Sequence, residues 1–150
     1  MLAAGLVLLA VATLAGCSGG SGAATEQNPA GGGGGSVSNY NGPAPATADV
    51  QSFKVNLWDN ISSNNRCGSC HSIDGAQAPM FARSDDVNLA YAAANGVVTL
   101  TSPQDSEMVS KVGGGHNCWL TSDAACGDIL TTWITNWAGD LVSAGGRKIE

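Results

Sequence analysis

Basic side chains are scarce in this 150-residue chain. Six Lys and Arg residues stand against twelve Asp and Glu residues, which gives a formal net charge of −6 at pH 7. The basic residues form no stripe and are scattered from Lys54 to Lys148. Binding to a nucleic-acid backbone needs clustered cations, so this composition argues against a nucleic-acid partner. The acidic balance instead suits solubility and a basic docking partner.

A hydrophobic run long enough to span a membrane is also missing. The apolar stretch from Leu2 to Leu14 falls short of the roughly 20 residues that a spanning helix needs. It matches the apolar core of an export signal. The ending at residues 14–17, LAGC, resembles the lipobox of bacterial lipoproteins. This resemblance implies cleavage before Cys17, lipid attachment at Cys17 and, with Ser18 next, anchoring at the outer membrane, facing the periplasm or the cell exterior.

Bulky apolar residues are nearly absent from residues 17–46, where Gly, Ala, Ser, Asn and Pro dominate. Such a segment cannot bury enough apolar surface to offset the entropy of ordering it. We therefore predict a signal peptide at 1–16, a lipidated flexible tether at 17–46 and a folded domain at 47–150. A domain of about 100 residues is marginal by burial alone and benefits from a covalent cofactor or crosslink.

Alternating strand patterns longer than residues 97–100 are missing as well, whereas helical spacing of apolar residues recurs. The sequence therefore predicts an all-α fold, a small bundle of about four helices. We expect them to run from the N-cap Thr47 to Ile61, from Ser84 to Gly96, from Ser102 to Gly113, and from Ser122 or Asp123 to about Ala138.

The chain has five cysteines and two histidines. Residues 67–71 read CGSCH, the only CxxCH motif present. This pattern suits covalent attachment of one haem c, because the thiols of Cys67 and Cys70 can bond the porphyrin edge while His71 ligates the iron. Three alternatives remain: a redox CxxC pair, a plain disulfide, and a zinc site in which His116 and Cys118 join the two motif cysteines.

The order of helix, CGSCH, loop, two middle helices and an aromatic-bearing last helix resembles the class I cytochrome c family over residues 47–139. The resemblance implies a cytochrome c-like bundle around one covalently attached haem. It also implies that the first and last helices cross beside the haem, with contacts made by Phe53, Leu57, Trp133 and Trp137.

The sixth iron ligand departs from that family, which usually supplies a Met from the loop before the last helix. Here this loop holds His116 and no Met, so His116 is the preferred distal ligand. Met80 is the alternative, Met108 fits better as a core side chain, and an open sixth position is a further possibility. Ligation by two histidines predicts a low-to-moderate reduction potential, since a Met ligand raises it.

Cys118 and Cys126 remain as a pair. Export places them in an oxidising compartment, so we expect a disulfide between them that steadies His116; two free thiols are the alternative.

The predicted function is electron transfer between redox protein partners near the membrane rather than enzymatic catalysis. The acidic residues are dispersed and offer no catalytic pair. A haem-based ligand-binding or sensor module, and less favourably a zinc-stapled interaction module, are the competing hypotheses.

Overall fold

The computed structural model describes residues 40–75 and 77–143, with side chains described as far as residue 140. Within these residues the regular structure is helical and contains no β-strand, as the sequence predicts. None of the described helices is long and apolar enough to cross a membrane. The helices are α1 (Ala48–Phe53), a π-helical turn (Lys54–Trp58), α2 (Asp59–Ile61), α3 (Val87–Ala94), α4 (Glu107–Gly113) and α5 (Asp123–Ser143).

The first helical segment, α1 to α2, is continuous and contains the π-helical turn in its middle. Thr47 caps it as predicted, since its hydroxyl oxygen accepts a hydrogen bond from the Val50 N–H at 3.2 Å. Amide side chains bond carbonyls along the widened turn: Asn56 donates to Ser52, and Asn60 donates to Asn56. The segment buries one apolar face, made of Val50, Phe53, Leu57, Trp58 and Ile61.

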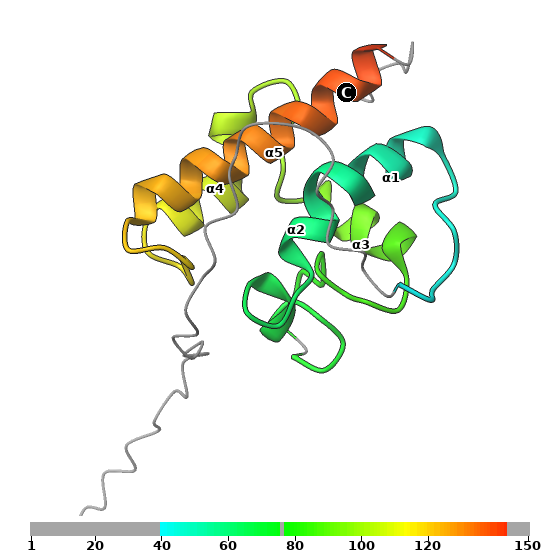
Figure 1. Ribbon diagram of the computed structural model, residues 1–150, viewed down its shortest axis with the longest axis horizontal. Helices are drawn as coiled ribbons and strands as arrows, with labels where there is room; N and C mark the ends of the chain where they lie inside the picture. Colours follow the sequence, from blue (N-terminus) through cyan, green and yellow to red (C-terminus); the bar gives the residue numbers. More distant parts are fainter. Residues whose placement is uncertain (1–39, 76, 144–150) are drawn as a thin grey trace, which may run out of the picture.

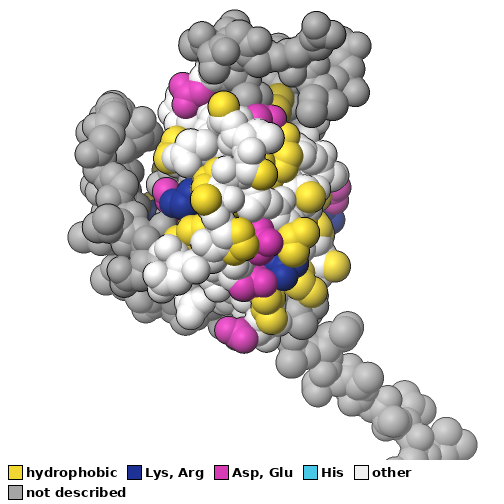
Figure 2. Space-filling model, turned by 90° about the vertical axis from the view of Figure 1, so that its right-hand side faces the viewer, with side chains coloured by type: hydrophobic (Ala, Val, Ile, Leu, Met, Phe, Trp, Pro, Cys, Tyr) yellow, Lys and Arg dark blue, Asp and Glu magenta, His cyan; other side chains and the backbone are white. Residues whose placement is uncertain are grey.

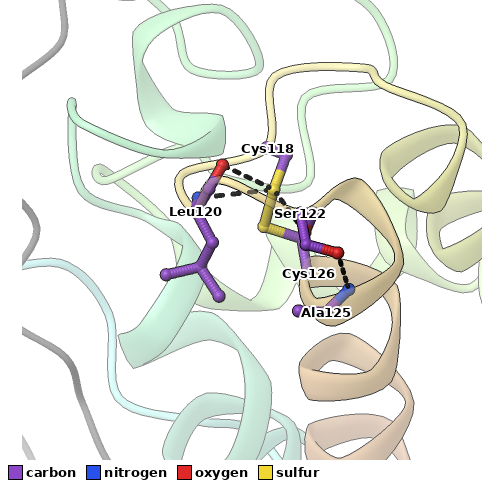
Figure 3. The surroundings of a disulfide bond; sticks show 5 residues. All are labelled: Cys118, Leu120, Ser122, Ala125 and Cys126. Carbon is purple, nitrogen blue, oxygen red and sulfur yellow. Dashed lines mark hydrogen bonds between the residues drawn. A yellow bond between two sulfur atoms is a disulfide. The ribbon is translucent and has the colours of Figure 1, made fainter.

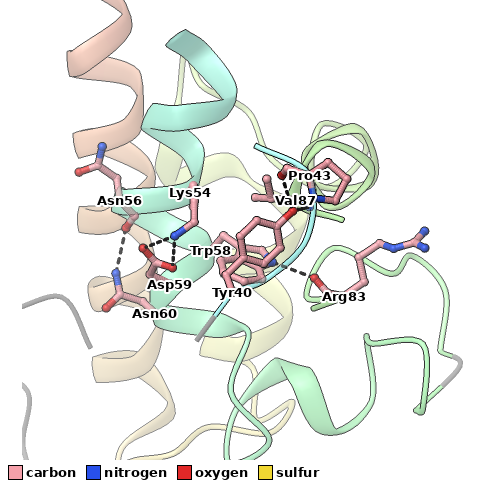
Figure 4. Close-up of polar contacts among 9 residues, drawn as sticks. All are labelled: Tyr40, Pro43, Lys54, Asn56, Trp58, Asp59, Asn60, Arg83 and Val87. Atoms are coloured by element: carbon pink, nitrogen blue, oxygen red, sulfur yellow. Dashed lines mark hydrogen bonds and ion pairs between the residues drawn. The ribbon is translucent and has the colours of Figure 1, made fainter. Parts of the chain in front are cut away.

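The packed part of the chain begins before this helix, at Tyr40. The Tyr40 ring meets the Trp58 ring edge-on, with 5.2 Å between centroids, and its hydroxyl accepts from the Val87 N–H at 2.9 Å (Figure 4). Lys54 lies over both rings and pairs with Asp59 at 2.9 Å. The segment at 40–46, assigned to the tether from composition, therefore lies against the π-helical turn and α3.

α3 starts later than predicted, because the two aspartates before it take different partners. The Asp86 carboxylate accepts from the Asn88 N–H at 2.8 Å and caps the helix. Asp85 instead pairs with Arg83 at 2.7 Å. The helix therefore begins after Asp86 and not at Ser84.

The third helical segment was predicted to start at Ser102 and is instead broken in two. A 3-10 turn spans Pro103–Asp105, and Ser106 then adopts an extended conformation before α4 begins. Ser106 is completely buried, and its hydroxyl accepts from the Thr99 N–H at 2.9 Å. This contact with the preceding loop holds Ser106 out of helical geometry.

α5 is the longest helix and runs past its predicted end near Ala138. It packs against both α4 and α1, and Figure 1 shows α4 beside its N-terminal half and α1 beside its C-terminal half. Phe53 of α1 meets Trp137 of α5 with 5.1 Å between ring centroids. Gly113 and Gly127 let α4 and α5 approach closely, since a Cβ at Gly127 would lie 3.3 Å from the Gly113 Cα. The predicted crossing of first and last helices is thus present.

Candidate functional site

The CGSCH motif at 67–71 forms a tight turn shortly after α2, called the attachment turn below. Cys67–Ser69 is a 3-10 helix, and the N–H groups of the two residues that follow both donate to the Cys67 carbonyl, at 3.2 and 2.8 Å. The turn packs against the end of the preceding helix so closely that a Cβ at Gly68 would overlap the Ser62 carbonyl. The glycine is therefore required by packing, which a CxxCH pattern does not reveal.

Both motif cysteines are buried, each with 8 % of its surface exposed. Cys67 is a free thiol, so the two motif cysteines are not joined in a disulfide with each other. Burial raises the pKa of Cys67 to about 11, and the positive charge of Arg66 offsets part of this effect. At neutral pH the Cys67 side chain is accordingly a protonated thiol within the apolar core.

The His71 ring is held on two sides by the loop after the attachment turn. Its Nδ1 lies 2.9 Å from the Pro79 carbonyl oxygen, and its ring stacks on Phe81 with 4.4 Å between centroids. Because a carbonyl oxygen only accepts, Nδ1 carries the proton and Nε2 of the neutral ring keeps a free lone pair. Histidines that bind metals are commonly oriented in this way.

His116 lies next to His71, although 45 positions separate them in the sequence. The two ring centroids are 6.1 Å apart, with 61° between the ring planes. A single metal ion with an imidazole nitrogen about 2 Å away on each side separates the ring centroids by about 6 Å. His116 is exposed and stands in the loop between α4 and α5, residues 114–122, called the ligand loop below. The chain's only two histidines therefore meet at one place.

The methionines lie elsewhere. Met108 is 4 % exposed and packs in the core through α4, as predicted. Met80 lies between Pro79 and Phe81, the two residues that contact the His71 ring. The backbone of Met80 is thus tied to the loop that holds the His71 ring.

Cys118 and Cys126 are joined by a disulfide with Cα atoms 5.7 Å apart, as expected (Figure 3). It connects the ligand loop to the first turn of α5, where Ser122 caps the helix by accepting from the Ala125 N–H. The bond also occupies a thiol that the four-ligand zinc site needed. Among the residues that the structure describes, no three His, Cys, Asp or Glu side chains gather as a metal site.

Arg66 is a residue of this site that sequence reasoning did not single out. It is buried, with 9 % exposure, and its guanidinium carbon lies 4.8 Å from the Trp119 ring and 5.1 Å from the Trp133 ring. The two tryptophan rings stack nearly parallel, 5.7 Å apart. Trp133, which the resemblance places among the contacts between the first and last helices, stacks on Trp119 of the ligand loop. Burial lowers the pKa of Arg66, and the neighbouring Cys67 opposes that effect.

Cys17, the signal segment 1–16 and the tether as far as residue 39 lie outside the described residues. Comparison with known proteins adds no assignment: no protein family matches the chain, and neither a curated protein nor a solved structure resembles it significantly.

Proposed function

We propose that this chain is a c-type cytochrome with one covalently bound haem, tethered to a membrane through Cys17, and that it transfers single electrons between redox proteins. The observation that carries this proposal is the meeting of His71 and His116 beside the CGSCH turn, with 6.1 Å between their ring centroids. Bound haem would supply an iron that changes between the ferrous and ferric states.

The residues present fit such a group. Cys67 and Cys70 stand two residues apart, the spacing that thioether bonds to the porphyrin edge require. Cys67 is a free thiol, whereas Cys70 is disulfide-bonded in this structure, so that bond must be reduced before the Cys70 thiol can react. His71 offers its Nε2 as the proximal ligand, because its Nδ1 is committed to the Pro79 carbonyl. His116 is the distal ligand on this proposal, and the disulfide two residues later limits how far the ligand loop can move. The all-helical frame of the described residues is in keeping with a class I-like cytochrome bundle.

The acidic surface and the tether define the setting of this electron transfer. On the face drawn in Figure 2, acidic side chains are scattered among hydrophobic and neutral ones, and basic side chains are few (Figure 2). A redox partner with a basic face would dock favourably on such a surface. The tether, with a reach of several nanometres at most, would let the domain exchange partners near a bacterial outer membrane.

Absorption spectroscopy of the full chain, produced together with haem-maturation machinery, tests the assignment. We expect one haem per chain that stays attached on denaturation and gives a c-type pyridine haemochrome spectrum. Replacing Cys67 and Cys70 with alanine should abolish this attachment. A chain that carries zinc and no haem under these conditions would refute the proposal.

Two single variants test the distal ligand. His116→Ala should convert low-spin ferric iron to high-spin iron, while Met80→Ala, the matched control, should leave the spectrum unchanged. The opposite pattern, or a methionine-to-iron charge-transfer band in the native protein, would move the ligand to Met80. Rapid carbon monoxide binding by the native ferrous protein would favour a ligand-binding module, because a firmly six-coordinate iron binds it slowly.

A further inference from the structure

The carbonyl oxygen of Arg66 links two parts of the site that are far apart in the sequence. It accepts one hydrogen bond from the Ser69 hydroxyl and one from the Asn117 side-chain amide, each at 3.1 Å. Ser69 belongs to the attachment turn, three residues from Arg66. Asn117 is 51 residues away and directly follows His116. The amide of Asn117 therefore ties the ligand loop to the attachment turn.

The backbone on both sides of His116 has an unusual conformation. Gly115 has a φ of 100° and Asn117 a φ of 51°, so both neighbours of His116 are in the left-handed region. Glycine and asparagine are the residues that adopt this region most readily. The His116 N–H also donates to the Lys111 carbonyl at 3.0 Å. His116 is thus fixed to the end of α4 before it and to Arg66 after it.

Arg66 itself is buried and held by contacts on several sides. Its Nη1 donates to the Asn60 carbonyl at 2.9 Å, at the end of the first helical segment. Its guanidinium lies against Trp119 of the ligand loop and Trp133 of α5. Cation–π contacts of this kind, made away from water, add to the stability of the arrangement. The same residue therefore meets the ligand loop twice, through its carbonyl and through its side chain.

From these contacts we infer that Asn117 is a positioning residue, which holds the His116 imidazole opposite His71 by bonding the Arg66 carbonyl. The inference rests on the proposed function, in which these two histidines are the axial ligands. Asn117 itself contacts no iron; it acts by restricting where the ligand loop places His116. Without its amide, His116 spends more time away from its ligating position.

The test is Asn117→Gly in the full-length haem protein, with Ser69→Ala as the matched control. Glycine tolerates the positive φ at position 117, so this variant removes the amide and leaves the backbone conformation accessible. Ser69→Ala removes the other donor to the same carbonyl without touching the ligand loop. Carbon monoxide binding to the ferrous protein measures how often the sixth position is open. Electron paramagnetic resonance of the ferric protein reports the orientation of the two imidazoles.

We expect Asn117→Gly to accelerate carbon monoxide binding about fivefold, because the variant loses the net contribution of one hydrogen bond. The same variant should shift the electron paramagnetic resonance spectrum. Ser69→Ala should change neither. Two variants that both match the native protein would overturn the inference, and so would two variants that change equally, since that pattern indicates general loosening of the attachment turn. Pyridine haemochrome spectra and the His116→Ala variant separate these outcomes from failure of the proposed function. Absent haem would overturn both the function and the inference. An unchanged His116→Ala spectrum would overturn the inference and the distal-ligand assignment, and would leave the haem protein standing.

Discussion

At the scale of single residues, the attachment turn contains a cysteine, Cys67, whose pKa is raised by burial. In a CxxCH motif the thiol is chemically consumed when haem is attached, yet the fold places Cys67 among apolar side chains. Burial favours the neutral thiol, and its pKa rises from an ordinary value of 9.0 to about 11. In protein made without haem, the folded state therefore binds this proton more tightly than the unfolded state does.

That difference predicts a pH dependence of stability in the haem-free protein. A group whose folded pKa is raised contributes stability that is present in full below pH 9 and is lost as the pH rises towards 11. The two-unit shift corresponds to about 3 kcal/mol. At pH 11 Cys67 is only half ionised in the folded protein, so urea unfolding at pH 8 and pH 11 should show native haem-free protein losing about 2 kcal/mol more than Cys67→Ser. Equal losses in the two proteins would contradict the assignment of the shift to Cys67.

Residues of the site differ in how far the sequence could predict them. Cys67, Cys70 and His71, the residues proposed to hold haem, follow from a short local motif, and His116 follows from the scarcity of histidine in the chain. Arg66 could not be predicted, because its role depends on contacts with Trp119, Trp133 and Asn117 that lie more than 50 positions away. A local pattern carries no information about such contacts.

At the scale of the elements, apolar periodicity predicted four helical segments and the structure contains them. The errors are at boundaries, where a tertiary contact overrides local preference. Ser102 and Pro103 are good helix starters, yet Ser106 is held in an extended conformation by the Thr99 N–H. Similarly, Arg83 engages Asp85 and leaves Asp86 as the cap of α3.

The crossing of α4 and α5 supplies an element-scale prediction. A Cβ at Gly127 lies 3.3 Å from the Gly113 Cα, whereas one at Gly139, in the same helix, meets no atom within 4 Å. Gly127→Val should lower the free energy of unfolding by about 1 to 3 kcal/mol, because the branched side chain forces α4 away. Gly139→Ala should raise it by about 0.5 to 1 kcal/mol through helix propensity. Urea unfolding measures both; a Gly127→Val protein as stable as the native one would show that this crossing is loosely packed.

For the molecule as a whole, charge is the property that bears most on the proposed electron transfer. The chain has a formal net charge of −6, and its few cations are partly engaged: Lys54 pairs with Asp59, and Arg83 with Asp85. Arg66 is buried. Each ion pair cancels one cation against one anion, so the net charge stays at −6, and its field extends over the Debye length of the solution.

This field predicts opposite salt effects for small redox reagents of opposite charge. At about 0.01 M ionic strength the Debye length is about 30 Å, and at about 1 M it falls to about 3 Å, so added salt screens the protein's charge. Stopped-flow oxidation of the ferrous protein by a cationic cobalt complex should therefore slow severalfold across this range. Oxidation by ferricyanide, an anion, should accelerate, because screening weakens its repulsion. The comparison controls for effects of salt on the protein itself, which would change both rates in the same direction. If salt changes both oxidation rates in the same direction, electron exchange occurs at a surface patch whose charge differs from the net charge of the molecule. The redox partner would then not need a basic face.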